Sequence, residues 1–114
     1  MDGYLPFRPA GSTVVIGVQP GSAPPATFAG GPVGGGDVGY MVYNPSVNDV
    51  WLGYGPTSTA ARDNSVVPLI GIPSGALAVP AGSLQVFTLA PQQFFSGVTQ
   101  LGSASVSVTP GYGA

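Results

Sequence analysis

The chain has 114 residues, a formal net charge of −2 and only six charged side chains, with no Lys, Glu, His or Cys. Ordinary soluble domains carry about a quarter of their residues as charged ones, whereas this chain carries 5%. The deficit excludes nucleic-acid binding by counterion release and indicates that much of the surface lies against another molecule.

A mass of 11.3 kDa leaves room for one domain, with no disulfide to staple it. The 19 Gly and 13 Pro residues reach the share at which disorder has to be considered. Disordered chains, however, lack β-branched and aromatic residues. Here such residues cluster into short runs, which favours strands separated by Gly/Pro turns.

Residues 1–37 are predicted to form an extended N-terminal arm with one strand. Within 1–11, Pro6 and Pro9 cannot donate to a ladder, and the apolar residues of this segment need a surface to bury against. Residues 12–18 alternate as a strand, with Val14, Ile16 and Val18 on one face. Residues 19–37 are then a long Pro/Gly/Ala loop with the single large anchor Phe28.

The remainder, residues 38–114, is predicted to be the core of the domain. Residues 44–49 read as a hairpin-like turn between its first two strands, residues 58–62 as one turn of helix at most, and residues 110–114 as the tail that ends the fold. Strands are predicted at residues 38–43, 50–54, 66–72, 77–79, 84–89, 94–99 and 104–109. Seven or eight short strands in all indicate an all-β fold, a β-sandwich (jelly-roll or Ig-like) or a small barrel.

The composition also argues against an enzyme. Without His and Lys there is no base for an activated Ser or Thr. A carboxylate pair would have to come from Asp2, Asp37, Asp49 and Asp63, all in turn-like or terminal segments, where Asp usually bonds its own backbone. Gly34–Gly36 lacks the Lys of a phosphate-binding loop and reads as a linker. We therefore expect no catalytic, metal or cofactor site.

The aromatic residues are the candidate binding groups. Tyr43 and Trp51 are expected to point away from the Val/Leu face of two adjacent strands, toward solvent or a partner. For Trp51, an interface role and a place in the sandwich core are equally supported, and stacking on a sugar ranks behind both. The candidate interface residues are Tyr4, Phe7, Phe28, Tyr43 and Trp51.

From residue 43 onward the chain resembles a known family. The similar pieces are residues 43–45 (YNP), 48–55 (NDVWLGYG), 72–73 (IP), 80–89 (PAGSLQVFTL) and 105–113 (SVSVTPGYG). In this order they resemble the small all-β head decoration or cement proteins encoded beside the major capsid protein in tailed bacteriophages. The similarity covers about two thirds of the chain and consists of turn glycines and strand apolar residues.

The resemblance implies a structural virion protein that binds the major capsid protein lattice and reinforces the phage head. Its partners would be the capsid protein and further copies or lattice neighbours, with no cofactor, nucleic acid or membrane. It would be made in the host cytoplasm, consistent with an N-terminus that lacks a signal-peptide pattern. We expect the arm to order on docking, so that removing residues 1–11 weakens binding. The alternatives are a tail or fibre adaptor and a carbohydrate-binding module.

Overall fold

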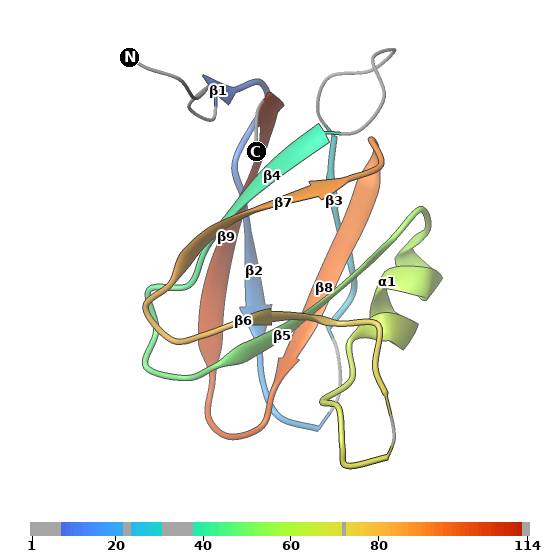
Figure 1. Cartoon of the computed structure of the whole chain (residues 1–114), viewed down its shortest axis with the longest axis vertical. Helices are drawn as coiled ribbons and strands as arrows, with labels where there is room; N and C mark the ends of the chain where they lie inside the picture. The colour runs from blue at the N-terminus through green and yellow to red at the C-terminus, as the bar shows by residue number, and fades with distance from the viewer. Residues whose placement is uncertain (1–7, 22–23, 31–37, 72, 113–114) are drawn as a thin grey trace.

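The computed structural model describes residues 8–21, 24–30, 38–71 and 73–112. They form two antiparallel sheets packed face to face, with one short helix beside the second sheet (Figure 1). Sheet A contains β1 (Arg8–Pro9), β2 (Val14–Val18), β4 (Val38–Tyr43), β7 (Leu84–Leu89) and β9 (Ala104–Tyr112). Sheet B contains β3 (Thr27–Ala29), β5 (Val50–Gly55), β6 (Leu77–Val79) and β8 (Gln93–Thr99), and the helix is α1 (Ser58–Asn64). The prediction of an all-β sandwich is confirmed.

The strands pair from the two ends of the chain inward. The pair β2·β9 encloses β3·β8, which encloses β4·β7, which encloses β5·β6, and all four pairs are antiparallel. Successive pairs lie alternately in sheet A and sheet B, and β4·β9 and β5·β8 join them. The resulting orders, β2-β9-β4-β7 and β3-β8-β5-β6, are those of a jelly roll, a long double-stranded ribbon rolled into two sheets.

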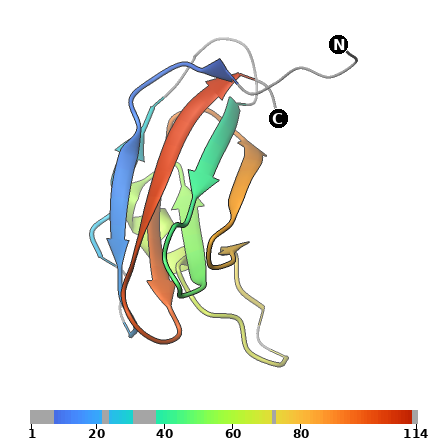
Figure 2. The same ribbon diagram turned by 90° about the vertical axis from the view of Figure 1, so that its left-hand side faces the viewer.

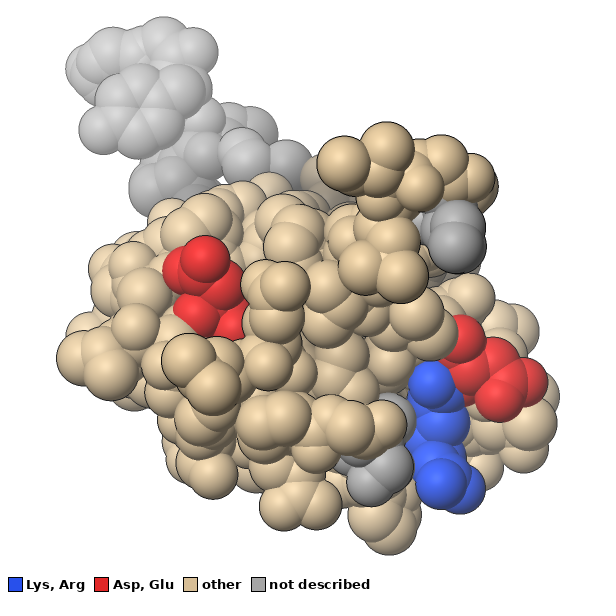
Figure 3. Space-filling model, turned by 90° about the horizontal axis from the view of Figure 1, so that it is seen from below, with Lys and Arg blue, Asp and Glu red and all other residues tan. Residues whose placement is uncertain are grey.

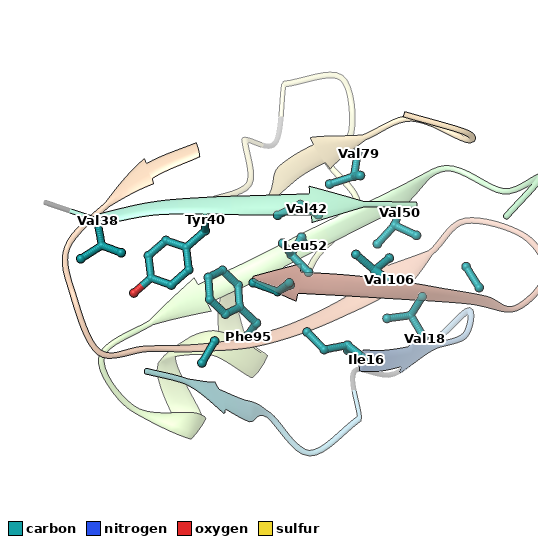
Figure 4. Close-up of a cluster of buried hydrophobic side chains, with 13 residues drawn as sticks. Ile16, Val18, Val38, Tyr40, Val42, Val50, Leu52, Val79, Phe95 and Val106 are labelled. Carbon is teal, nitrogen blue, oxygen red and sulfur yellow. The ribbon is translucent and has the colours of Figure 1, made fainter. Parts of the chain in front are cut away.

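The space between the sheets is filled by an apolar cluster. Ile16 and Val18 from β2 and Val106 from β9 meet Leu52 and Phe95 of the opposite sheet, and all are nearly fully buried (Figure 4). Tyr40 of sheet A packs edge-on against Phe95 of sheet B, with ring centroids 5.1 Å apart. Since burying a large apolar side chain contributes about 1.5–3 kcal/mol, this layer supplies the main stabilisation of the sandwich.

The expected hairpin between β4 and β5 is wrong. The two strands lie in different sheets, and residues 44–49 carry the chain from sheet A to sheet B. The buried side chain of Asn44 holds this crossing. Its amide donates to the carbonyl groups of Asn48 (2.9 Å) and Val79 (3.0 Å), while its oxygen accepts from the Ser46 hydroxyl (2.6 Å).

Two expectations about the first third of the chain also change. The predicted loop 19–37 contains strand β3, and Phe28 lies on it rather than in a loop. The sandwich is not confined to residues 38–114, because β2 and β3 pair with β9 and β8 and bury Ile16, Val18 and Ala29 in the core. The part of the arm at residues 1–7 lies outside the described residues.

The strand expected at residues 66–72 is absent from its described part, residues 66–71, which hold only an isolated bridge residue at Leu69. Pro68 lacks a donor and Gly71 turns the chain with φ +77°, so the apolar side chains Val66, Leu69 and Ile70 remain exposed. The preceding helix is longer than the single turn expected. It spans seven residues, and the Thr57 hydroxyl caps it by accepting from the backbone N–H of Ala60 (3.1 Å).

Strand β9 continues past Pro110, where the sequence suggested that it ends. The carbonyl of Pro110 accepts a hydrogen bond from Ala10 N–H at 2.9 Å. Because the nitrogen and carbonyl of one residue face the same side of an antiparallel strand, the Pro110 nitrogen also faces Ala10. On that side the neighbouring strand is interrupted between β1 and β2. The missing N–H of proline therefore falls at the end of β1, next to a break in the ladder, where the loss of one hydrogen bond is tolerated.

Candidate interface on the outer face of sheet A

The outer face of sheet A carries a row of side chains that crosses the whole sheet. Val15, Ser107, Tyr43 and Leu84 are opposite one another in the register of the four strands. These strands, β2, β9, β4 and β7, lie side by side in this order (Figure 2). Val15, Tyr43 and Leu84 are 66%, 44% and 60% exposed. We call these four side chains the apolar row.

A second row on the same face lies one ladder step away. It contains Thr109, Met41 and Val86, also in register. The Thr109 hydroxyl is hydrogen-bonded to the hydroxyl of Thr13 at 2.7 Å. Both rows therefore consist of aliphatic, thioether, aromatic and hydroxyl side chains, and neither contains a charged one.

The charged side chains that the structure describes lie elsewhere. Asp49 follows the crossing between the sheets, and its carboxylate accepts from Ala81 N–H at 2.8 Å. Arg62 and Asp63 are on α1, which packs against β5 and β8 of sheet B. In the view from below, the charged side chains of the described residues gather at two places (Figure 3).

The candidate residues of the sequence do not form one site. Tyr43 and Trp51 both point away from the Val/Leu face, as predicted. Tyr43, however, is on the outer face of sheet A and Trp51 on that of sheet B, so the two aromatic side chains lie on opposite sides of the sandwich. Trp51 is only half-buried and sits in register with Ala78 and Val98. Tyr4 and Phe7 lie outside the described residues.

Phe28 occupies a different part of the outer face of sheet B. It is 45% exposed and packs on Phe94 of the neighbouring strand, with ring centroids 5.0 Å apart. The row of Phe94 is separated from that of Trp51 by the row of Gly53 and Ser96. Helix α1 covers this middle row, so Phe28 and Trp51 are not brought together either.

Val15 and Leu84 are interface candidates that reasoning from the sequence missed. The clean alternation of residues 12–18 places Val15 opposite the buried Ile16 and Val18, and this signal was sufficient to find it. Leu84 gave no such signal. Residues 84–89 are apolar on both faces, and only the pairing with β4 shows which face is outside.

The described residues contain no group of three or more His, Cys, Asp and Glu side chains that could hold a metal ion. Asp49 and Asp63 belong to separate elements, while Asp2 and Asp37 lie outside the described part of the chain. A hollow of about 370 Å³ beside α1 is lined mainly by Val66, Leu69, Val98 and Thr99. Within the described ranges, no helix has both the length and the apolar stretch to cross a bilayer.

Comparison with known proteins gives no assignment. No protein-family model, no curated protein sequence and no solved structure matches the chain.

Proposed function

We propose that this protein is a structural component of a virion, a decoration or cement protein that binds the major capsid protein lattice of a phage head. The observation that carries the proposal is the outer face of sheet A, with its exposed apolar row and no charged side chain in either row. The capsid as partner comes from the resemblance of residues 43–113 to head decoration proteins.

The physical argument concerns the cost of docking. Removing a charge from water costs several kcal/mol unless it is paired in the interface, and a lattice protein must bury the same face at every copy. Tyr43, Leu84 and Val15 can be buried without that cost, and the hydroxyl groups of Thr13 and Thr109 already bond one another. Such a face suits tight packing against a repeated, largely neutral surface.

The jelly-roll topology supports the proposal only by analogy. Jelly rolls occur in viral capsid and lectin domains, which match two of the functions weighed from the sequence. A fold does not fix a function. Trp51 is the aromatic candidate for stacking on a sugar, and it is half-buried in a strand row. The two rows without charge on the outer face of sheet A therefore favour protein docking over glycan binding.

Co-sedimentation with shells of the neighbouring gene's capsid protein tests the proposal. Wild-type protein should bind saturably, at a stoichiometry near that of the capsid subunits. Tyr43→Lys, which places a charge in the apolar row, should lower the affinity by about tenfold or more. The matched control is Val66→Lys, at a side chain of similar exposure (48%) that belongs to no strand and lies beside β8 of sheet B rather than on sheet A.

Two outcomes would contradict the proposal. If the shells do not bind wild-type protein, a tail or fibre component becomes the better assignment. If Tyr43→Lys binds as well as Val66→Lys, the outer face of sheet A is not the docking surface. A truncation that tests the N-terminal arm should end at residue 7, because removing residues 1–11 also removes β1, which pairs with β9.

A further inference from the structure

The four outermost positions of the two sheets differ in how well they are protected against pairing with another strand. In sheet B, β3 and β6 are only three residues long. Pro25 lies two residues before β3, and Pro80 directly follows β6. In sheet A, β2 contains Gly17, and just after it the chain bends to β8, where Thr99 N–H donates to Gln19. Short edges, prolines and bends of this kind prevent edge-to-edge association.

Strand β7 has none of these protections. It is six residues long and reads Leu-Gln-Val-Phe-Thr-Leu, without Pro, Gly or a charged residue. Among the described residues it lies at the end of the strand order of sheet A, paired on one side with β4 (Figure 2). An edge strand that is long, uncharged and apolar is a template for a further strand.

The direction of its free hydrogen-bonding groups follows from the ladder. Asn44 N–H donates to the carbonyl of Ser83 at 2.9 Å, so these opposed residues form a hydrogen-bonded pair. Such pairs alternate along antiparallel strands. Leu84, Val86 and Thr88 are consequently the residues whose backbone N–H and C=O groups point away from β4, toward the open edge.

These three residues are arranged for pairing with themselves. If a second β7 runs antiparallel with Val86 opposite Val86, Leu84 of each strand faces Thr88 of the other. The three opposed pairs would form about six backbone hydrogen bonds around a two-fold axis. No like charges meet across the axis, because β7 carries none.

We propose that β7 pairs with β7 of a second copy of this chain and so joins two copies of sheet A into one continuous sheet. The half-buried Phe87 and Leu89 pack against the core beside this edge, and the second copy would cover them. The two apolar rows, each ending at Leu84, would lie next to one another on one broad face. The pairing does not depend on the proposed capsid role.

Sedimentation equilibrium of single variants tests the pairing. Wild-type protein should be dimeric at micromolar concentration. Val86→Lys and Val86→Asp should each be monomeric at concentrations where wild type is dimeric, because like charges would face each other across the two-fold axis. Mixing the two variants should restore a dimer, since Lys then faces Asp.

A control variant distinguishes a charge at the β7 edge from a charge elsewhere on the outer face of sheet A. Val15→Lys places the same charge on the outer face of sheet A but at the opposite edge, and it should remain dimeric. Thermal melting of each variant establishes that it is folded. A monomeric wild type, dimers of Val86→Lys, or monomers of Val15→Lys would each overturn the proposal.

A disulfide provides a direct readout of the register. The chain contains no Cys, so Val86→Cys introduces a single thiol. Opposed residues in such a pair have Cα atoms about 5.5 Å apart, within the range that a disulfide bridges. Mild oxidation should give a covalent dimer of Val86→Cys but not of Val15→Cys. Equal yields from both variants would contradict the proposed register.

Discussion

At the scale of the residue, Asn44 shows how one polar side chain can fix the path of the chain. It is fully buried, yet both ends of its amide are hydrogen-bonded. Its donors reach the carbonyl groups of Val79 and Pro80, which precede β7, as well as Asn48, which precedes β5. The Asn44 side chain therefore links the crossing from β4 to β5 with the segment that leads from β6 into β7, the strand at the open edge.

We expect Asn44→Ala to lower the free energy of unfolding by about 2–4 kcal/mol, because the backbone carbonyl groups of Val79, Asn48 and Pro80 lose their donor in a buried or partly buried position. Asn44→Asp keeps the shape but places an acceptor against those carbonyls, and it should be at least as harmful at neutral pH. Urea unfolding measures both. The control is Val47→Ala in the same segment, at a side chain that is 90% exposed; a comparable loss there would contradict the role of Asn44.

Tyr40 predicts a dependence of stability on alkaline pH. Burial raises the pKa of its hydroxyl above the ordinary value of 10.0, although backbone hydrogen bonds at Gln93 and Gln92 partly oppose this. As the pH rises through about 10, the unfolded chain loses the proton first. The contribution of Tyr40 to stability is therefore complete below pH 10 and falls above it.

The measurement is the urea midpoint between neutral pH and pH 11, for wild type and Tyr40→Phe. The variant should be less stable by about 1 kcal/mol at neutral pH, because the hydroxyl donates to the Ala90 carbonyl at 3.2 Å. It should also lose less stability above pH 10 than wild type does. Parallel curves for the two proteins would show that Tyr40 does not cause the dependence.

At the scale of the element, two glycines of β5 explain where α1 lies. Gly53 and Gly55 face outward, and a Cβ added at Gly53 would collide with the Ser65 hydroxyl and the Ala61 carbonyl, and would come within 2.6 Å of Ser65 N. At Gly55 it would lie 2.7 Å from the Ala60 side chain. The helix can pack directly on the sheet backbone only because these side chains are absent.

Gly53→Ala should therefore displace α1 and destabilise the protein by about 2 kcal/mol or more. Gly17→Ala is the matched control, since Gly17 is also a strand glycine, and its added Cβ would meet nothing within 4 Å. Thermal unfolding should show a large loss for the first variant and a change of less than about 1 kcal/mol for the second. Equal losses would mean that the sheet, rather than the helix contact, requires glycine.

At the scale of the whole molecule, the few charges predict weak salt dependence. Only 5% of the residues are charged, and none is in the two rows of the outer face of sheet A. Salt therefore has few electrostatic interactions to screen. Raising the salt from about 0.1 M to about 1 M shortens the Debye length roughly threefold. We expect the midpoint of unfolding and the β7-mediated dimerisation to change little over this range. A steep loss of dimer with sodium chloride would indicate a charged interface instead.

How far the sequence predicted the structure depends on the distance between the residues concerned. Alternation over a few residues located Val14, Ile16 and Val18 and the strand of Ala104, Val106 and Val108, because each strand shows its buried face locally. The hairpin prediction for residues 44–49 failed because a turn motif looks alike whether it reverses the chain within one sheet or carries it to another. The outward orientation of Tyr43 and Trp51 was predicted correctly from alternation, whereas the outward position of Leu84 was not.

The sequence by itself determined the class of this protein: short alternating strands require an all-β fold, and the lack of charge marks a surface suited to burial. Only the tertiary structure decided which strands are neighbours. The pairing of β2 with β9 joins segments about ninety residues apart, and no local pattern encodes a contact at that separation, since alternation is the same for every possible partner. That pairing places Val15, Tyr43 and Leu84 in one row and leaves β7 at an open edge.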